Sequence, residues 1–181
     1  MRAVGIILAG GNNSRMKELS RKRAVGAMPI AGSYRAIDFA LSNMSNSHIQ
    51  KVAVLTQYNA WSLNEHLSSS KWWDFGRKQG GLFVFTPSIT SDNGFWYRGT
   101  ADAIAQNIAF LKKSHEPYVV IASADAVYKM DYNKVLEKHV ETGADLTIVC
   151  KNAGDKADVS EYGVVSTDIN GRVVDFEEKP L

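Results

Sequence analysis

Short apolar runs alternate along the chain with segments whose apolar residues recur every three or four positions. The runs are rich in β-branched residues, and the earlier ones are nearly uninterrupted, which is typical of strands buried on both faces of a parallel sheet. The predicted strands span residues 3–9, 51–56, 118–123, 145–151, 163–166 and 173–176. Because predicted helices lie between them, the pattern indicates an α/β fold with a mostly parallel sheet.

Helical spacing of apolar residues marks the segments 35–45, 100–112 and 131–142. We expect Thr100 and Asp131 to cap the second and third helices, and Gly143 to end the third. Ligands of open parallel sheets bind beyond the carboxyl ends of the strands. The loop 10–15 and the segment around Asp125 both follow predicted strands, so the sequence places them at that edge of the sheet.

The stretch 68–94 follows neither pattern. It holds aromatic residues among glycines and charges, and neither a helix nor a clean hairpin emerges from its spacing. Since such a stretch is long for a connection, we expect a functional or partner-facing excursion there.

The bulk composition narrows the class of protein. With 181 residues, 45% of them hydrophobic and 22% charged, the chain is long enough for one domain with its own core. A net charge of +2 is too balanced to indicate a nucleic-acid partner or an acidic membrane surface. Cys150 has no second cysteine to pair with and lies in an apolar run, so we expect a buried core thiol. Neither a signal-peptide pattern nor a run of about 18 apolar residues occurs, which leads us to expect a cytoplasmic protein without membrane contact.

A glycine-containing turn follows the first predicted strand. Gly10 and Gly11 permit a tight turn whose backbone N–H groups can bind phosphate, and Arg15 is the charged residue best placed to reach it. Neither a G-x-G-x-x-G fingerprint nor a G-x-x-x-x-G-K-[ST] loop is present. Taken alone, the segment is as typical of an ordinary turn with a solvated arginine as of a nucleotide site.

Further positions suit phosphate or metal chemistry, each with an ordinary alternative. Asp125 ends a predicted strand, where a carboxylate can bind Mg²⁺ or simply cap a turn. Gly99 and Thr100 open a predicted helix whose first N–H groups can meet an anion or be capped within the chain. Lys179 follows a predicted strand, where it can pair with a sugar phosphate or remain a surface lysine. A basic cluster at residues 21–23 is either a cationic approach to such a site or a solvated charge run.

Considered together, these segments resemble the N-terminal part of glucose-1-phosphate adenylyltransferase (ADP-glucose pyrophosphorylase). The stretches that match in order and approximate spacing are IILAGG, Arg15, KRA, YRAIDFALSN, LTQYNAWSLNEH, WYRGTADAIAQN, YKMDY, YGVV and FEEKP. YRAIDFALSN and WYRGTADA are specific to this family, whereas LAGG and EKP are shared by sugar-nucleotide pyrophosphorylases in general. The resemblance implies a Rossmann-like α/β domain of the nucleotide-diphospho-sugar transferase type, of which residues 1–181 would be the N-terminal part. The rest of that domain and a C-terminal left-handed β-helix would follow.

The resemblance also implies a reaction and a set of site residues. In that family the phosphate of glucose 1-phosphate attacks the α-phosphate of ATP, pyrophosphate leaves and ADP-glucose forms, with Mg²⁺ neutralising charge. Carried over by match, Arg15 and Asp125 would be catalytic, Asp125 would bind the Mg²⁺, and the second metal carboxylate would lie beyond Leu181. The nucleotide would contact Leu8, Ala9, Gly10, Gly11, Arg15, Gly99 and Thr100. Glucose 1-phosphate would contact Tyr97, Gly163, Glu178 and Lys179.

Departures from the family pattern gather on the nucleotide side. The second glycine of the family's G-x-G-x-R loop is Asn13 here. The family's K-R-A-K-P segment is KRAVG, which puts Val25 and Gly26 at its lysine and proline. The family's G-D-H strand end is ADA at 124–126, and the glutamine that reads the base aligns with Ser88. Losing one preorganised charge contact can lower a rate by about 10²–10³-fold, so several losses should leave little turnover.

This pattern resembles the D-type subunit of the family, which is poorly active alone and modulates a catalytic partner in a hetero-oligomer. We therefore expect a regulatory subunit for glycogen biosynthesis, assembled with a catalytic subunit in a tetramer, with ATP or ADP-glucose and glucose 1-phosphate as ligands. Two alternatives remain open: a competent adenylyltransferase that tolerates the loop changes, and a module that senses a sugar phosphate without transfer chemistry. A paired Val25→Lys and Asn13→Gly exchange separates the regulatory subunit from the competent enzyme, since only an impaired enzyme should gain much activity from it.

Overall fold

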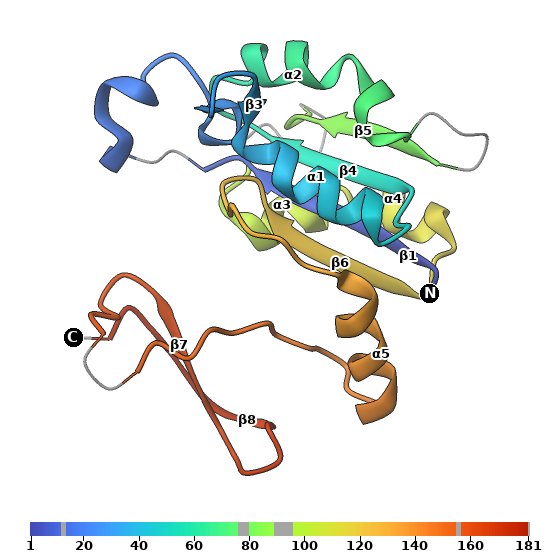
Figure 1. Ribbon diagram of the computed structural model, residues 1–181, viewed down its shortest axis with the longest axis vertical. Coiled ribbons are helices and arrows are strands. Elements are labelled where there is room, and N and C mark those ends of the chain that lie inside the picture. Colours follow the sequence, from blue (N-terminus) through green and yellow to red (C-terminus); the bar gives the residue numbers. More distant parts are fainter. Residues whose placement is uncertain (12–13, 76–79, 89–95, 155–156, 181) are drawn as a thin grey trace. The chain divides into compact units, whose positions relative to one another are not determined.

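The computed structural model describes residues 1–11, 14–75, 80–88, 96–154 and 157–180. The chain divides into two compact units, Met1–Lys138 and His139–Leu181. The first is built on a four-stranded parallel sheet with the order β5-β4-β1-β6 (Figure 1). These strands are β1 (Ala3–Ala9), β4 (Lys51–Thr56), β5 (Gly81–Phe85) and β6 (Tyr118–Ser123). The architecture confirms the predicted α/β fold.

Helices cover both faces of this sheet because alternate residues of its central strands point to opposite sides. Ile7 of β1 and Val54 of β4 pack in one apolar cluster with α1 (Ala36–Asn46) and α2 (Trp61–Leu67). Ile6 and Leu55 pack on the other face, where the cluster includes residues of α3 (Thr100–Gln106) and α4 (Ile108–Ser114). The nearly continuous burial of β1 and β4 therefore results from two covered faces.

Short elements connect the central sheet to its helices. They are the 3₁₀ helices η1 (Ser14–Leu19), η2 (Val25–Ala27) and η3 (Ser70–Trp73), and the antiparallel pair β2 (Pro29–Ile30) and β3 (Tyr34–Arg35). Helix α5 (Tyr132–Thr142) begins in the first unit and ends in the second. The second unit contains an antiparallel hairpin of β7 (Gly163–Thr167) and β8 (Val173–Glu178). Among the helices of the described residues, none combines the length and the apolar character that a membrane crossing requires.

Several helix boundaries differ from the prediction. The segment expected as one helix over 100–112 is two, α3 and α4, which part at Asn107. Thr100 is the first residue of α3 and Gly99 occupies the cap position, so the expected Thr100 cap is wrong. The Asp131 cap is confirmed, because its Oδ1 accepts a hydrogen bond from the backbone N–H of Asn133 at 3.0 Å. Gly143 also follows α5 as predicted, with a left-handed φ of 59°.

The predicted strands omit one strand and include one that does not form. The stretch 68–94, where the pattern indicated neither a helix nor a hairpin, contains β5, which pairs with β4 and extends the central sheet, although part of that stretch lies outside the described residues. The functional or partner-facing role expected there stays a prediction. The expected strand at 145–151 does not form, and Leu146 within it is 73% exposed. Cys150 is likewise exposed and is not the core thiol that the pattern predicted. An apolar run becomes a strand only where a neighbouring strand accepts its backbone hydrogen bonds, and the described strands provide none for this run.

Candidate functional site

The carboxyl ends of β1 and β6 meet at one edge of the central sheet. Leu8 pairs with Ser123 across the two strands. Gly10 lies two residues after Leu8, and Asp125 lies two residues after Ser123. The backbone N–H of Ala124 donates to the carbonyl of Leu8 at 3.0 Å, which keeps the strands together past the end of β6. The structure therefore brings the predicted nucleotide turn and the predicted metal carboxylate to the same end of neighbouring strands.

The carboxylate of Asp125 is exposed and is oriented by its neighbour in sequence. The hydroxyl of Ser123 donates a hydrogen bond to Oδ1 of Asp125. Within the described residues, no cluster of three or more His, Cys, Asp or Glu side chains could hold a metal by itself. A single accessible carboxylate fits Mg²⁺, which takes its remaining ligands from water and substrate phosphates.

The KRA segment leads into a turn beside this strand end. In η2, the backbone N–H of Ala27 donates to the carbonyl of Ala24 at 2.9 Å. Arg35 also supports the turn, since its Nη1 donates to the carbonyl of Ala27 at 3.2 Å. Val25, at the position of the family's lysine, is half-buried, and Gly26 is buried. The turn thus presents an apolar side chain where the resemblance would place a cation.

Asp38 of the YRAIDFALSN motif fixes the start of α1. Its Oδ2 accepts a hydrogen bond from the backbone N–H of Arg35 at 2.8 Å. Its Oδ1 lies 2.6 Å from Nε2 of His66, which belongs to α2. A carboxylate in the first turn also interacts favourably with the N-terminal end of a helix. Because the side chain of Arg35 also donates to η2, Asp38 connects α1 and α2 to the turn beside Asp125.

Gln57, directly after β4, binds the backbone of Tyr97. Its Oε1 accepts from the N–H of Tyr97 at 2.6 Å, and its Nε2 donates to the carbonyl at 3.4 Å. The ring of Tyr97 is only 8% exposed, and its hydroxyl accepts a hydrogen bond from Asn107 at 3.0 Å. The predicted sugar contact at Tyr97 stays a prediction, but its side chain also serves the core. Sequence reasoning gave Gln57 no role, although LTQY was among the matching stretches.

The first turn of α3 contains a carboxylate side chain, that of Asp102. Asp102 accepts hydrogen bonds at 2.9 Å from the backbone N–H of Arg98 and from Nε2 of Gln106. The backbone N–H of Arg98 is the main cause that lowers the pKa of Asp102 below its usual value. This geometry favours a helix that is capped within the chain. A nucleotide contact at Gly99 and Thr100 stays a prediction.

In the second unit, the hairpin brings predicted sugar-phosphate residues together. Gly163 pairs with Glu178 across β7 and β8. Lys179 follows directly, with a left-handed φ of 51°, and its N–H donates to the carbonyl of Tyr162 at 2.9 Å. The three predicted contacts at Gly163, Glu178 and Lys179 are therefore neighbours at one end of the hairpin.

In the predicted nucleotide loop, Asn13 lies outside the described residues, and the backbone of Arg15 lies in η1. A nucleotide contact of Arg15 stays a prediction. Ser88, aligned with the family's base-reading glutamine, follows β5 and is exposed.

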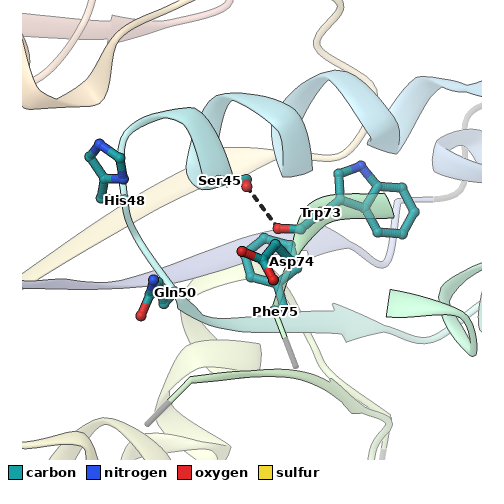
Figure 2. Close-up of a pocket in the computed structure, with 6 residues that line it drawn as sticks. All are labelled: Ser45, His48, Gln50, Trp73, Asp74 and Phe75. Atoms are coloured by element: carbon teal, nitrogen blue, oxygen red, sulfur yellow. Dashed lines mark hydrogen bonds between the residues drawn. The ribbon is translucent and has the colours of Figure 1, made fainter. Parts of the chain in front are cut away.

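A separate pocket lies between the end of α1 and η3. It is lined by Ser45, His48, Gln50, Trp73, Asp74 and Phe75. Figure 2 shows the hydroxyl of Ser45 donating to the carbonyl of Trp73, at 2.7 Å. Because His48 and Gln50 precede β4, this pocket is at the amino end of that strand. It is therefore at the sheet edge opposite to the predicted nucleotide side.

A parallel sheet with a glycine turn and an acidic strand end on adjacent strands is the framework of an α/β nucleotide-binding enzyme. A family model described as nucleotidyl transferase matches residues 4–181, and the chain belongs to that family. Within it, the chain is similar to proteins named glucose-1-phosphate adenylyltransferase. The identity is 44% to that of Clostridium novyi and 44% to that of Thermosipho africanus, over 98% of this chain in both cases. It is 45% to that of Clostridium perfringens strain SM101, again over 98% of the chain.

These matches confirm the family resemblance that the motifs indicate. The chain spans less than half the length of these curated relatives, with 46%, 43% and 45% of their lengths covered.

Proposed function

We propose that the chain belongs to a regulatory subunit of glucose-1-phosphate adenylyltransferase with weak or no activity of its own. A catalytic subunit of the same family would then perform most of the transfer from ATP to glucose 1-phosphate in a hetero-oligomer. The similarity to named adenylyltransferases supports the reaction and its ligands.

The observation that carries the impaired activity is the apolar environment of Asp125. It is flanked by Ala124, which is buried, and Ala126, which is half-buried. The adjoining turn contributes Val25 and Gly26. In nucleotidyl transfer, positive groups must stabilise the charge that develops on the phosphates. With apolar residues at these positions, the described part of the site offers little of that stabilisation.

Asp125 would still allow nucleotide binding with Mg²⁺. Its exposed carboxylate would hold the ion, and the hydroxyl of Ser123 would keep that carboxylate oriented. When bound, Mg²⁺ would neutralise phosphate charge. The hairpin end with Gly163, Glu178 and Lys179 would contact the sugar phosphate. Ligand binding without efficient transfer is what a regulatory subunit requires.

An activity assay tests the proposal directly. The purified full-length chain, the catalytic subunit and their mixture are each supplied with ATP, Mg²⁺ and glucose 1-phosphate, and ADP-glucose is measured. We expect little product from the chain alone and a changed rate or effector response in the mixture. The matched variant Asp125→Asn removes the carboxylate proposed to bind Mg²⁺, so its mixture should lose the effect of this chain on the effector response while the partner's own rate is retained.

Two results would contradict the regulatory role. A family-typical rate from the chain alone would refute the regulatory proposal in favour of a competent enzyme. In that case the Val25→Lys and Asn13→Gly pair should add almost nothing, whereas an impaired subunit should gain strongly. Calorimetric binding of glucose 1-phosphate without any binding of Mg²⁺ and ATP would instead indicate a sugar-phosphate-sensing module.

A further inference from the structure

Gly26 has no space for a side chain, because Ala124 occupies that space. A Cβ placed on Gly26 would lie 2.9 Å from Cβ of Ala124 and 3.7 Å from Cβ of Ile37. Non-bonded carbon atoms are optimally separated by about 3.5–4.0 Å. Gly26 is buried, and Ala124 is only 2% exposed. The backbone of η2 and the methyl group of Ala124 are therefore in direct contact.

The glycine at position 26 is explained by this contact and not by its backbone. Gly26 does not belong to the described glycines whose φ is positive. A residue with a side chain could adopt its backbone conformation but would overlap with Ala124.

Neither side of the contact is free to move away. The turn is held by the hydrogen bond from Ala27 to Ala24 within η2 and by the guanidinium of Arg35. The strand end is held by the hydrogen bond from Ala124 to the carbonyl of Leu8 on β1. Closely packed interiors with fixed backbones relax only in part when an atom is added.

We propose that Gly26 and Ala124 are a size-matched pair of positioning residues that sets the separation between η2 and the strand end bearing Asp125. Ala124 directly precedes Asp125, and Gly26 directly follows Val25. A side chain at position 26 and the methyl group of Ala124 would occupy the same space, so the sizes of these two residues are coupled and together keep the turn beside Asp125. The positioning role rests on the proposed binding of Mg²⁺ and nucleotide at Asp125.

A double-mutant cycle on the full-length chain tests the coupling. Gly26→Ala should lower the midpoint of thermal unfolding by about 5 °C through overpacking. Ala124→Gly alone should lower it less. The double variant should unfold close to Ala124→Gly, because removing the methyl group makes room for the new one. Additive losses would overturn the pairing, as would a double variant that fails to fold while Ala124→Gly folds.

Gly5→Ala is the matched control for a tight glycine elsewhere in the sheet. Its added Cβ would lie 2.9 Å from Sδ of Met44 and 3.2 Å from Cγ2 of Val52, and Ala124 is not among its three nearest neighbours. Ala124→Gly should therefore give no rescue in this background. Rescue there would show a general effect of the Ala124 substitution and would overturn the specific pairing.

The positioning role is read from calorimetric titration of the same variants with ATP and Mg²⁺. Gly26→Ala should weaken binding several-fold, the double variant should restore it, and Gly5→Ala should leave it unchanged. If rescue appears in the unfolding midpoint but not in the affinity, the pair is structural and the positioning role is wrong. If the unaltered chain does not bind ATP with Mg²⁺, the nucleotide binding in the proposed function fails and the positioning role with it, whereas the unfolding cycle still decides the pairing.

Discussion

Asn43 joins α1 to the segment that follows Asp125. Its side chain donates from Nδ2 to the carbonyl of Tyr128 at 3.0 Å and accepts from the N–H of Met130 at 3.1 Å. Asn43 is 4% exposed. Asn43→Ala removes both hydrogen bonds at once and leaves two backbone groups without these partners.

The structure allows the size of the effect to be worked out. A buried backbone group that loses its partner costs about 1–3 kcal/mol. Tyr128 and Met130 are half-buried, so water can reach the two groups in part and the lower end of that range applies to each. We therefore expect a loss of about 2–3 kcal/mol in the free energy of unfolding. For a chain of this size, that lowers the midpoint of thermal unfolding by about 4–12 °C.

The assay compares Asn43→Ala with Asn64→Ala, which alters an exposed residue of α2. Thermal unfolding is followed by circular dichroism, and amide hydrogen exchange is followed over the segment after Asp125. Exchange at Met130 should accelerate more than at Tyr132, whose N–H donates to Oγ of Ser47 at 2.9 Å. If the two variants unfold within about 0.5 kcal/mol of each other, the contact contributes nothing and the reasoning is refuted.

Other perturbations give equally direct tests. Burial raises the pKa of Tyr132 above its usual value of 10.0, so its neutral form stabilises the folded chain below about pH 10 and this stability is lost at higher pH. Tyr132→Phe should therefore flatten the fall of the unfolding midpoint above about pH 10. The N–H of Arg98 holds the pKa of Asp102 below 3.8, so its contribution is present above that pH and is lost as the pH falls further. Asp102→Asn should remove this acid-range decline, and an unchanged curve would contradict it. Gly163→Ala would place a Cβ 2.8 Å from Cε2 of Phe176 and 3.1 Å from Oε2 of Glu178, which displaces the predicted sugar-phosphate residues at this end of the hairpin. Calorimetry should therefore show weaker binding of glucose 1-phosphate, and unchanged affinity would count against their role.

The central strands could be predicted because their sequences are continuous apolar runs. β1, β4 and β6 agree residue for residue with the predicted ranges. β1 and β4 are covered on both faces, as such runs indicate, whereas Val119 and Ile121 of β6 are exposed. The same rule explains why 145–151 was misread. Its composition is that of a buried strand, but whether such a run pairs depends on the strands around it, which composition does not specify.

The polar contacts around the site were beyond sequence reasoning for a different reason. Asp38, Asn43 and Gln57 all lie within stretches that match the family, and the motifs gave each of them no specific role. Asp38 is only three residues from the N–H of Arg35, but its second partner, His66, is 28 residues away. Gln57 binds Tyr97 across 40 residues. Such pairings follow from the packing of the helices on the sheet and cannot be read from local spacing.

In the sheet that the described residues form, β6 is the last strand, and one of its edges is unpaired. Its sequence, YVVIAS, has neither a charge nor a proline, and Val119 and Ile121 are 42% and 51% exposed. Natural sheets usually protect such edges with charges or prolines, because unpaired backbone groups recruit strands from other molecules. A net charge of +2 adds little mutual repulsion between copies. The edge of β6 therefore favours association between copies of the chain in concentrated solution, and a lysine at position 119 or 121 should reduce that association.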